Sequence, residues 1–388
     1  MKIFNLFFLL FLNILYSQAI WKVKVVDEQE GTPIPNARIL FSSEVLYTND
    51  DGEVLIPENK NVNMIDITKS GYISEKLTTG TSLLKMKPLY KQLEEVKIIN
   101  VDIKKIFEEV SKKYTKLYYS APSLYDIVYK QKNTDNGGLS FLLIAEASLW
   151  TSSNFYSFKY KNDYDQFVQM ELNDIKYFKS AEDKNDFFKG SSLDQSKDFV
   201  GNIFFNYELI RVLGFLSVKD VKLSGRLTND TDHEQLIHFK IHAPLAGVNI
   251  SGSILYNKVD HIITRYEANY DQSELPYYKN KTDNGIDYEF KPGNGTVIFE
   301  FYKKDNKYIP SLSEIKGESY VLYEGKKNVK TFNREIIFQR FNETKTGGLQ
   351  NKIDLNKKLW ENIPNDKNKD SNVLLSKDEQ RFIEQKND

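Results

Sequence analysis

The chain has 388 residues and a nearly balanced charge, with 53 Lys and Arg against 54 Asp and Glu. It shows no basic stripe, so we expect no nucleic-acid partner. It has no cysteine, which excludes disulfides, thiolate metal sites, cysteine nucleophiles and a lipid-modified cysteine. The length predicts about two domains, and the 24 Tyr and 25 Phe favour sheets, where aromatic side chains pack well across strands.

Residues 1–19 are predicted to be a secretory signal. Lys2 precedes an apolar core at residues 4–15, and the small residues Ser17 and Ala19 follow at the positions that a signal peptidase reads. A membrane anchor is the alternative, but the apolar stretch is shorter than the ~20 residues of a spanning helix. An exported chain without cysteine fits a bacterial envelope, so we expect it in the periplasm or the outer membrane.

Short alternating strands separated by turns fill residues 20–89. The pair Asp51-Gly52 is a tight-turn signal, because glycine adopts a positive φ without strain. About seven strands at this spacing predict a β-sandwich. The expected strands are Trp21–Asp27, Ala37–Phe41, Val45–Tyr47, Val54–Ile56, Asn63–Thr68, Ile73–Thr78 and Ser82–Lys87.

Several motifs in this region together carry a family resemblance. They are Asp27, Gly-Thr-Pro-Ile-Pro-Asn-Ala at 31–37, Thr48, Asp51-Gly52 and Lys-Ser-Gly-Tyr at 69–72. In these residues the stretch from about Ile20 to Leu89 resembles the carboxypeptidase regulatory-like domain. That family has a transthyretin-like sandwich and often begins exported proteins of Bacteroidetes-type bacteria. The resemblance implies an interaction module and no enzyme, since the zinc ligands of those carboxypeptidases lie in another domain.

The same module precedes the plug of many TonB-dependent receptors, and residues 93–99 are similar to the segment that follows it there. The rest of this chain is too short for a plug and a large barrel. We therefore expect a linker at 90–101, an antiparallel β domain with a leading helix at 102–345, and a charged tail at 346–388.

The β domain is expected to begin with an amphipathic helix capped by Asp102 and running to about Tyr114. Its apolar face most simply covers a core, and a partner-binding helix is the alternative. The expected fold class is mainly β, with the sandwich followed by a large curved antiparallel sheet or half-barrel and a few helices. Strands are expected at 125–131, 141–147, 154–160, 235–242, 249–256, 261–270, 296–302, 319–323 and 331–341, and helices near 207–216 and 376–384.

A helix followed by a long antiparallel meander is similar to the periplasmic lipoprotein-carrier fold, in which a curved half-barrel wraps helices and holds acyl chains. The segments 251–260, 261–267 and 307–310 look like that type of sheet. This resemblance lies in the pattern of elements, so it carries over no functional residue. It implies an apolar ligand for the C-terminal domain.

Motifs for chemistry are sparse in this sequence. His238 and His242 are four residues apart on a predicted strand, where they span ~13 Å and cannot share one ion. We see no local zinc, nucleophile or phosphate-loop motif, and we expect no metal, no cofactor and no local set of catalytic residues. A pair of carboxylates distant in sequence stays open, because such pairs leave no local signal.

Tyr277 and Tyr278 are the candidate ligand-binding residues. Together with Phe187 and Phe188 they are aromatic residues in turn-rich stretches, where they can stack on a sugar or line an apolar mouth. Partial packing against the sheet is the alternative.

Three hypotheses follow. The first is a non-enzymatic envelope protein, peripherally associated with the outer membrane, with an interaction sandwich and a C-terminal domain that binds an apolar ligand or a partner protein. The second is a surface component that binds or processes carbohydrate. The third is an enzyme with scattered catalytic carboxylates. An apolar lining inside the sheet would favour the first, a shallow aromatic groove the second, and two close carboxylates the third.

Overall fold

The computed structural model describes residues 20–41, 44–57, 64–88, 99–157, 164–181, 200–282, 285–345, 347–355, 357, 359–363 and 374–385. The chain divides into two compact units. Unit 1 comprises Met1–Gln92 and Asn372–Lys377, and unit 2 comprises Leu93–Ser371 and Asp378–Asp388. The predicted signal at 1–19 and most of the predicted linker lie outside the described residues.

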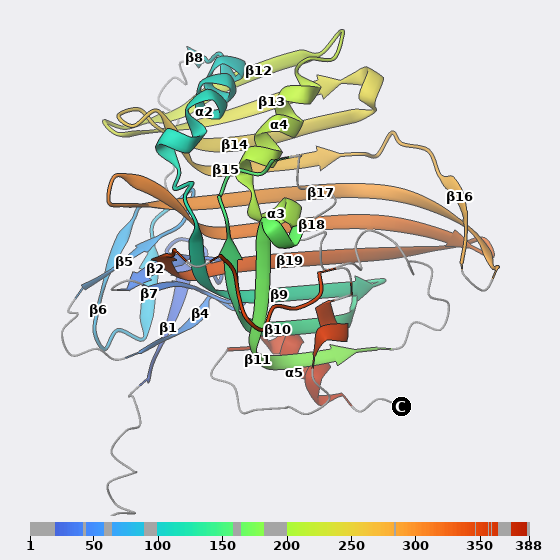
Figure 1. Ribbon diagram of the computed structural model, residues 1–388, viewed down its shortest axis with the longest axis horizontal. Coiled ribbons are helices and arrows are strands. Elements are labelled where there is room, and N and C mark those ends of the chain that lie inside the picture. Colours follow the sequence, from blue (N-terminus) through green and yellow to red (C-terminus); the bar gives the residue numbers. More distant parts are fainter. Residues whose placement is uncertain are drawn as a thin grey trace, which may run out of the picture. The chain divides into compact units, whose positions relative to one another are not determined.

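Unit 1 is a small β-sandwich, as its alternating strands predict (Figure 1). One sheet has the order β4-β1-β7 and the other the order β3-β2-β5-β6. Val23, Ile39, Ile67 and Leu77 are fully buried in the core that both sheets share. The strands are β1 Ile20–Asp27, β2 Arg38–Phe41, β3 Glu44–Tyr47, β4 Glu53–Pro57, β5 Met64–Thr68, β6 Glu75–Thr78 and β7 Leu83–Met86.

Asp27, one of the motif residues, organises the end of β1. Its Oδ1 accepts hydrogen bonds from the backbone N–H groups of Gln29 and Glu30, at 2.7 and 2.9 Å. Its Oδ2 accepts one from the hydroxyl of Tyr72 at 3.0 Å. The backbone hydrogen bond from Glu30 is the main reason that the pKa of Asp27 lies below its ordinary value. Asp27 and the Lys-Ser-Gly-Tyr motif are thus joined by a structural contact.

Thr48 and Gly52 hold the loops of the sandwich. Thr48 Oγ1 accepts a hydrogen bond from Ala37 N–H at 2.9 Å and donates one to the carbonyl of Ile34 at 2.7 Å. Gly52 has a φ of +72°, and a Cβ there would lie 2.5 Å from the carbonyl oxygen of Val25. Only glycine fits that position. These motif residues therefore have a structural explanation.

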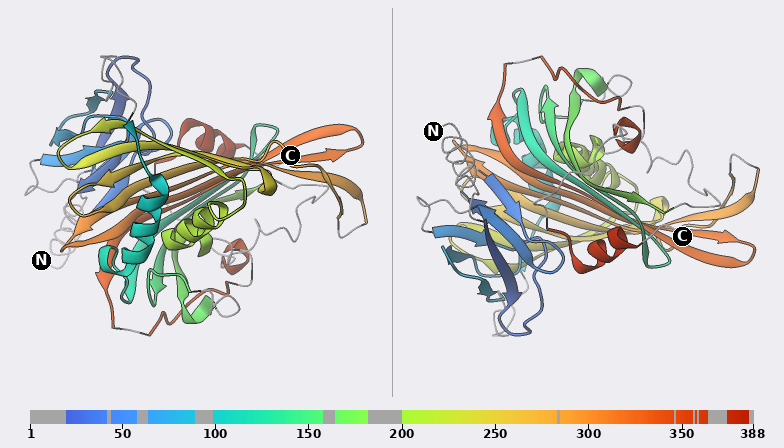
Figure 2. Two further views of the ribbon diagram at one scale, coloured as in Figure 1. Left: turned by 90° about the horizontal axis from the view of Figure 1, so that it is seen from above. Right: turned by 90° about the horizontal axis from the view of Figure 1, so that it is seen from below.

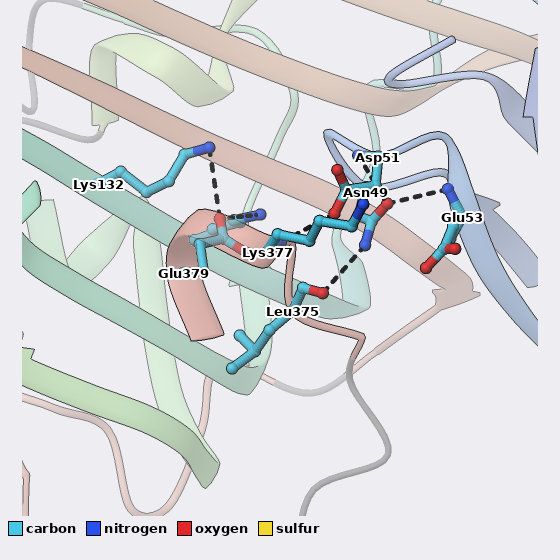
Figure 3. Close-up of polar contacts among 8 residues, drawn as sticks. Asn49, Asp51, Glu53, Lys132, Leu375, Lys377 and Glu379 are labelled. Carbon is cyan, nitrogen blue, oxygen red and sulfur yellow. Dashed lines mark hydrogen bonds and ion pairs between the residues drawn. The ribbon is translucent and has the colours of Figure 1, made fainter. Parts of the chain in front are cut away.

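The turn between β3 and β4 also contacts the late segment of unit 1 (Figure 3). Asn49 Oδ1 accepts hydrogen bonds from the N–H groups of Asp51 and Glu53, at 3.0 and 2.9 Å. Asn49 Nδ2 donates to the carbonyl of Leu375 at 3.3 Å, and Asp51 Oδ2 accepts from Lys377 N–H at 2.8 Å. The polar turn thus binds the backbone of residues 375–377 through two side chains.

Unit 2 is built on one twelve-stranded antiparallel sheet that stays open, with the order β11-β10-β9-β19-β18-β17-β15-β14-β13-β12-β8 and β16 paired to β17. Its first long strand, β9, lies beside its last, β19. The strands are β8 Ile99–Asn100, β9 Ser123–Asp135, β10 Gly138–Thr151, β11 Val168–Ser180, β12 Lys222–Asp230, β13 Glu234–Ala243, β14 Val248–Asn257, β15 Ile262–Asp271, β16 Tyr278–Lys281, β17 Asp287–Lys304, β18 Lys307–Tyr323 and β19 Lys326–Glu343. This large curved antiparallel sheet confirms the predicted mainly-β fold class.

Helices cover one face of this sheet, which we call the inner face (Figure 2). The leading helix α2, Ile103–Leu117, is capped by Asp102 as predicted, since its Oδ1 accepts Lys105 N–H at 3.1 Å. Helices α3, Val200–Ile203, and α4, Phe205–Phe215, follow. None of the described helices combines the length and apolarity needed to cross a bilayer. Short 3-10 helices lie at Tyr164–Gln166, Pro244–Ala246 and Leu359–Asn362.

Aromatic side chains fill the space between the inner face and the helices. Phe205 of α4 packs against Tyr266, Phe299 and Phe301, with ring centroids 5.3–5.4 Å apart. Phe107 of α2 meets Phe239 edge-on at 5.4 Å. A second cluster around β9–β11 and β19 continues this core. The inner face is therefore apolar and covered by helices of the same chain.

The opposite, outer face carries charged side chains and a final helix, α5, Lys377–Glu384, close to the predicted 376–384. Glu379 of α5 is almost fully buried and forms ion pairs with Lys130 at 2.7 Å and Lys132 at 3.4 Å, both on β9. At the other end of the helix, Lys179 Nζ donates to the carbonyl of Phe382 at 2.7 Å. These contacts place residues 378–384 of α5 against β9–β11.

One predicted strand, 154–160, is wrong over the described residues 154–157, which have no regular structure. The alternating aromatics of this segment pack without strand pairing. Tyr156 N–H donates to Asn206 Oδ1 at 2.8 Å, and Asn206 Nδ2 donates to the carbonyl of Tyr156 at 3.1 Å. A side-chain amide thus satisfies the backbone that a neighbouring strand would otherwise bind. The chain forms β11 later, at 168–180, and that strand was not predicted.

Candidate functional site

The two predicted ligand-binding residues lie on a projecting part of the large sheet. Tyr278 is the first residue of β16 and Tyr277 precedes it, with 49% and 37% of their surfaces exposed. Both are among the more exposed large hydrophobic side chains of the described residues. Phe187 and Phe188, the other aromatic pair, lie outside the described residues.

This projection, which we call the arm, consists of residues 277–282, 285–293 and 317–330. It exists because β17, β18 and β19 have 17 or 18 residues each, whereas the neighbouring β15 has 10 and ends its pairing at Gly295. Figures 1 and 2 show these strands continuing past the end of β15, with β16 beside them. The arm is thus a four-stranded extension of one part of the sheet.

One face of the arm has a small core of its own. Tyr288 and Val321 are buried there, and Ile286, Phe290 and Tyr323 pack against them. Burial raises the pKa of Tyr288 above its ordinary value. Because Tyr278 pairs directly with Phe290, its side chain lies on this aromatic face. The core lets four strands project without the support of the helices.

The other face of the arm pairs cations with tyrosine rings. Lys291 Nζ lies 5.7 Å from the ring centroid of Tyr277 and donates to a backbone carbonyl at 2.6 Å. Lys327 Nζ lies 4.0 Å from the ring centroid of Tyr320. The Tyr320 hydroxyl donates to Glu318 at 2.9 Å, and this hydrogen bond raises the pKa of Tyr320. These contacts fix the orientation of two tyrosines on an exposed surface.

A second polar cluster, which the sequence did not predict, lies under α4 on the inner face. Glu208 is 2% exposed and accepts hydrogen bonds from the hydroxyls of Tyr266, at 2.8 Å, and Tyr270. Its other oxygen pairs with Arg211 at 2.6 Å, and the Arg211 guanidinium lies 4.3 Å from the Tyr270 ring centroid.

The surroundings of Glu208 keep both tyrosines protonated. Burial raises the pKa of Tyr266 and of Tyr270 well above the ordinary value, and the nearby Glu208 carboxylate raises both further. Burial lowers the pKa of Arg211, but Glu208, Tyr270 and Tyr266 together more than offset this, so the pKa lies above its ordinary value and Arg211 remains a cation. One carboxylate thus has three fixed donors, an arrangement that stabilises α4 against β15.

A signal for this cluster was present in the sequence. The predicted helix near 207–216 buries Phe205, Leu209 and Val212, and Glu208 falls at i+3 on the same face. A glutamate in an apolar stripe requires a buried partner. Arg211 three residues later and the tyrosines of β15 are that partner set.

The remaining candidates for chemistry have structural explanations. His238 and His242 lie on the outer face of β13 beside the side chain of Lys240, as predicted. Among the described residues, no group of three or more His, Asp or Glu side chains has the arrangement to hold a metal ion. Glu267 and Glu300 approach the same Arg265, at 2.8 and 2.9 Å, so that pair is joined by a cation on the outer face.

Comparisons with known proteins give no family for this chain. No family model matches it, and no curated protein matches it. One similar solved structure comes from Bacteroides fragilis and is described as a "putative membrane-associated protein of unknown function". It is 6% identical, and the match covers 83% of this chain and 97% of that chain with a TM-score of 0.16. That TM-score is too low to support an argument about fold or function.

Proposed function

We propose that this protein is a non-catalytic component of a bacterial cell envelope that binds a protein partner through the arm. The observation that carries the proposal is the exposure of Tyr277 and Tyr278 on a projection with its own core. Exposed tyrosines held by neighbouring side chains are typical of protein interfaces, because a ring gives a large contact area at a small entropic cost.

The N-terminal sandwich is proposed to be an interaction module of the carboxypeptidase regulatory-like type. The motif residues Asp27, Thr48, Gly52 and Tyr72 all serve the sandwich itself, through the hydrogen bonds and the positive φ described above. A motif that maintains a scaffold leaves the exposed loops free to vary. The sandwich would then contribute binding of a partner through those loops.

Export to the periplasm or the outer membrane follows from the predicted signal at residues 1–19 and belongs to this proposal. Lys2, the apolar stretch and the small residues at 17 and 19 support it. Peripheral association with the outer membrane would come from the partner. N-terminal analysis of the purified mature protein tests the signal, since it should begin near Ile20; an intact Met1 in fractionated envelopes would contradict it.

A protein partner fits better than the apolar ligand that a lipoprotein-carrier sheet would hold. The inner face does have the expected apolar lining, but Phe205, Phe107 and Tyr118 of the chain's own helical segments cover it and are at most 1% exposed. Carbohydrate is the second candidate, because the half-exposed Tyr277 ring beside Lys291 offers a surface on which a sugar can stack.

Site-specific photocrosslinking in the native envelope tests the proposal. A benzophenone amino acid at position 278 should give a discrete adduct with one protein, and Tyr277→Ser should reduce its yield severalfold. The matched control is position 259, where Val259 is 64% exposed in the β14–β15 connection. Equal adducts at both positions, or no adduct at position 278, would contradict a partner site on the arm. If the protein instead binds a glycan matrix and Tyr277→Ser abolishes that binding, carbohydrate is the favoured ligand.

A further inference from the structure

The outer edge of β16 leaves backbone groups available for another strand. Thr282 N–H donates to the carbonyl of Ile286 at 2.9 Å, which makes these residues a hydrogen-bonded pair of the antiparallel ladder. Hydrogen-bonded pairs alternate along the ladder, so Asn280 and Tyr278 also bond to β17. The backbone N–H and C=O groups of Lys279 and Lys281 therefore point away from β17. The Lys281 N–H donates to Asn280 Oδ1 at 2.9 Å.

Nothing in the described part of the chain pairs with that edge. Among the described residues β16 pairs with β17 alone, and no backbone hydrogen bond from them reaches its other side. All four side chains of β16 are exposed. Among the described residues, the N–H and C=O groups of Lys279 and the C=O group of Lys281 have no partner at this edge, and such an edge is a template for adding a strand.

The side chains beside this edge determine which strand fits. Lys279 lies opposite Glu289 and Lys281 opposite Asp287, with an ion pair of 3.2 Å in the second case. Edge lysines repel basic strands and disfavour unselective pairing. An incoming strand with acidic residues opposite both lysines would make the charge alternate across three strands, from the acidic residues of β17 to the lysines of β16 to the acidic residues of the partner. Opposite charges that face each other directly on neighbouring strands stabilise a sheet.

The other face of the same edge favours apolar residues in the partner. Tyr278 lies on the aromatic face of the arm beside Phe290. Successive side chains of a strand point to opposite faces. If the acidic residues of the partner strand lie on the face of the two lysines, the residues between them lie on the opposite face, beside Tyr278. The complementary segment is therefore extended, with acidic and apolar residues in alternation.

We propose that the outer edge of β16 binds an extended acidic segment of a partner protein by adding it as a further strand. This inference rests on the proposed function, since it specifies the partner that the arm would bind. It commits to main-chain pairing with the N–H and C=O groups of Lys279 and the C=O group of Lys281, with Tyr278 as the apolar contact.

Two substitutions at one position separate the backbone from the side chain. Lys279→Ala removes the charge and keeps the outward N–H, whereas Lys279→Pro removes that N–H while leaving the inward bonds of Tyr278 and Asn280 in place. The probe is a labelled short peptide alternating valine and glutamate, with a valine–lysine peptide as control. Fluorescence anisotropy with the mature full-length protein measures binding, and circular dichroism checks folding.

The valine–glutamate peptide should bind, the valine–lysine peptide should not, and Lys279→Pro should weaken binding by about tenfold while Lys279→Ala weakens it about twofold. Equal affinities of the two variants, or equal binding of both peptides, would overturn the edge-strand inference. If the photocrosslink at position 278 persists in Lys279→Pro, the arm still binds its partner and only the strand addition is wrong. A concentration-dependent dimer that Lys279→Pro dissociates would contradict the acidic partner and identify a second copy as the occupant.

Discussion

Glu208 is a carboxylate that unit 2 buries at a considerable cost. Its oxygens have three fixed donors, Tyr266, Tyr270 and Arg211, and its helix packs over β15. A buried charge destabilises the fold unless its hydrogen bonds are complete. The cluster therefore stabilises the docked position of α4 only while every member is present.

Glu208→Ala should lower the free energy of unfolding of unit 2 by about 3 kcal/mol, because it leaves two buried phenols and a guanidinium without their acceptor. Arg211→Ala should cost less, about 1 kcal/mol, since 40% of the arginine side chain is exposed and water can take its place. Urea unfolding followed by circular dichroism measures both. A larger loss for Arg211→Ala would show that the carboxylate is not the centre of this network.

Asp27 makes the sandwich sensitive to acid. Its pKa lies below the ordinary value of 3.8 in the folded state, chiefly through the hydrogen bond from Glu30 N–H. A depressed pKa means that the contribution to stability is complete above 3.8 and is lost as the pH falls through the folded value. Asp27→Asn should therefore flatten the acid dependence of sandwich unfolding.

Fluorescence of Trp21 reports that unfolding, because its side chain is buried in unit 1 and donates to the carbonyl of Thr81 at 2.7 Å. Trp150→Phe and Trp360→Phe remove the other two signals. Tyr72→Phe is the matched variant, since it keeps the carboxylate and deletes one donor. An acid profile of Asp27→Asn identical to that of the parent would exclude Asp27 as the titrating group.

Two glycines of unit 2 differ in the space that is available for a side chain. A Cβ at Gly317, at the base of the arm on β18, would lie 2.3 Å from the ring of Phe332 on β19. A Cβ at Gly214 in α4 would meet nothing within 4 Å. The first position is closed by an aromatic ring and the second is open.

Gly317→Ala should destabilise unit 2 by about 2 kcal/mol, because the Phe332 ring must leave its place over the backbone. Gly214→Ala should instead stabilise it by about 0.5 kcal/mol, since alanine is the better helix former. Thermal unfolding of the two variants beside the parent checks both signs. Equal effects would mean that the contact with Phe332 has no weight.

Helix α5 has eight residues, too few for a stable isolated helix, so its docking on the outer face maintains it. Glu379→Lys should release it by placing a cation against Lys130 and Lys132 (Figure 3 shows Lys132). Hydrogen exchange of residues 378–385 should accelerate by at least about tenfold. The double charge reversal Lys130→Glu with Glu379→Lys should restore part of the protection; no restoration would argue against ion pairing as the anchor.

Sequence patterns predicted the elements in which apolar residues recur with the regular spacing of a helix or a strand. The stripe of Ile103, Phe107, Val110 and Tyr114 predicted α2, and strict alternation predicted the seven strands of the sandwich. The pattern failed at 154–157, where Asn206, distant in sequence, binds the backbone of Tyr156. The arm could not be predicted either. How far β17, β18 and β19 extend past the end of β15 depends on pairing between segments that are far apart in the sequence.

The candidate site was predicted only as a pair of exposed aromatic residues. Tyr277 and Tyr278 are where the sequence placed them, on the surface, but their relation to Lys291, Phe290 and the open edge needed the register of β16 on β17. A one-residue shift of that register would exchange the two faces. Such a detail is a property of the assembled sheet.

The architecture of unit 2 depends on one long-range pairing, in which β19 lies between β9 and β18. A chain ending at Glu324 should therefore lose cooperative unfolding of unit 2, because β9 loses its partner along its whole length and β18 loses it from Leu312 to Tyr323. Near-ultraviolet circular dichroism and limited proteolysis measure this loss. A control chain that lacks residues 378–388 keeps every strand and should retain the transition; a retained transition in the shorter chain would contradict the role of β19.

The same pairing sets a delay during synthesis. Asp135 of β9 meets Lys330 of β19, 195 residues later in the chain. At ~5–20 residues per second, a ribosome needs about 10–40 s to make the strand that closes this gap. Throughout that interval the edge of β9 that will pair with β19 has unpaired N–H and C=O groups beside apolar side chains, so the nascent protein has a long window in which a chaperone must shield it from aggregation.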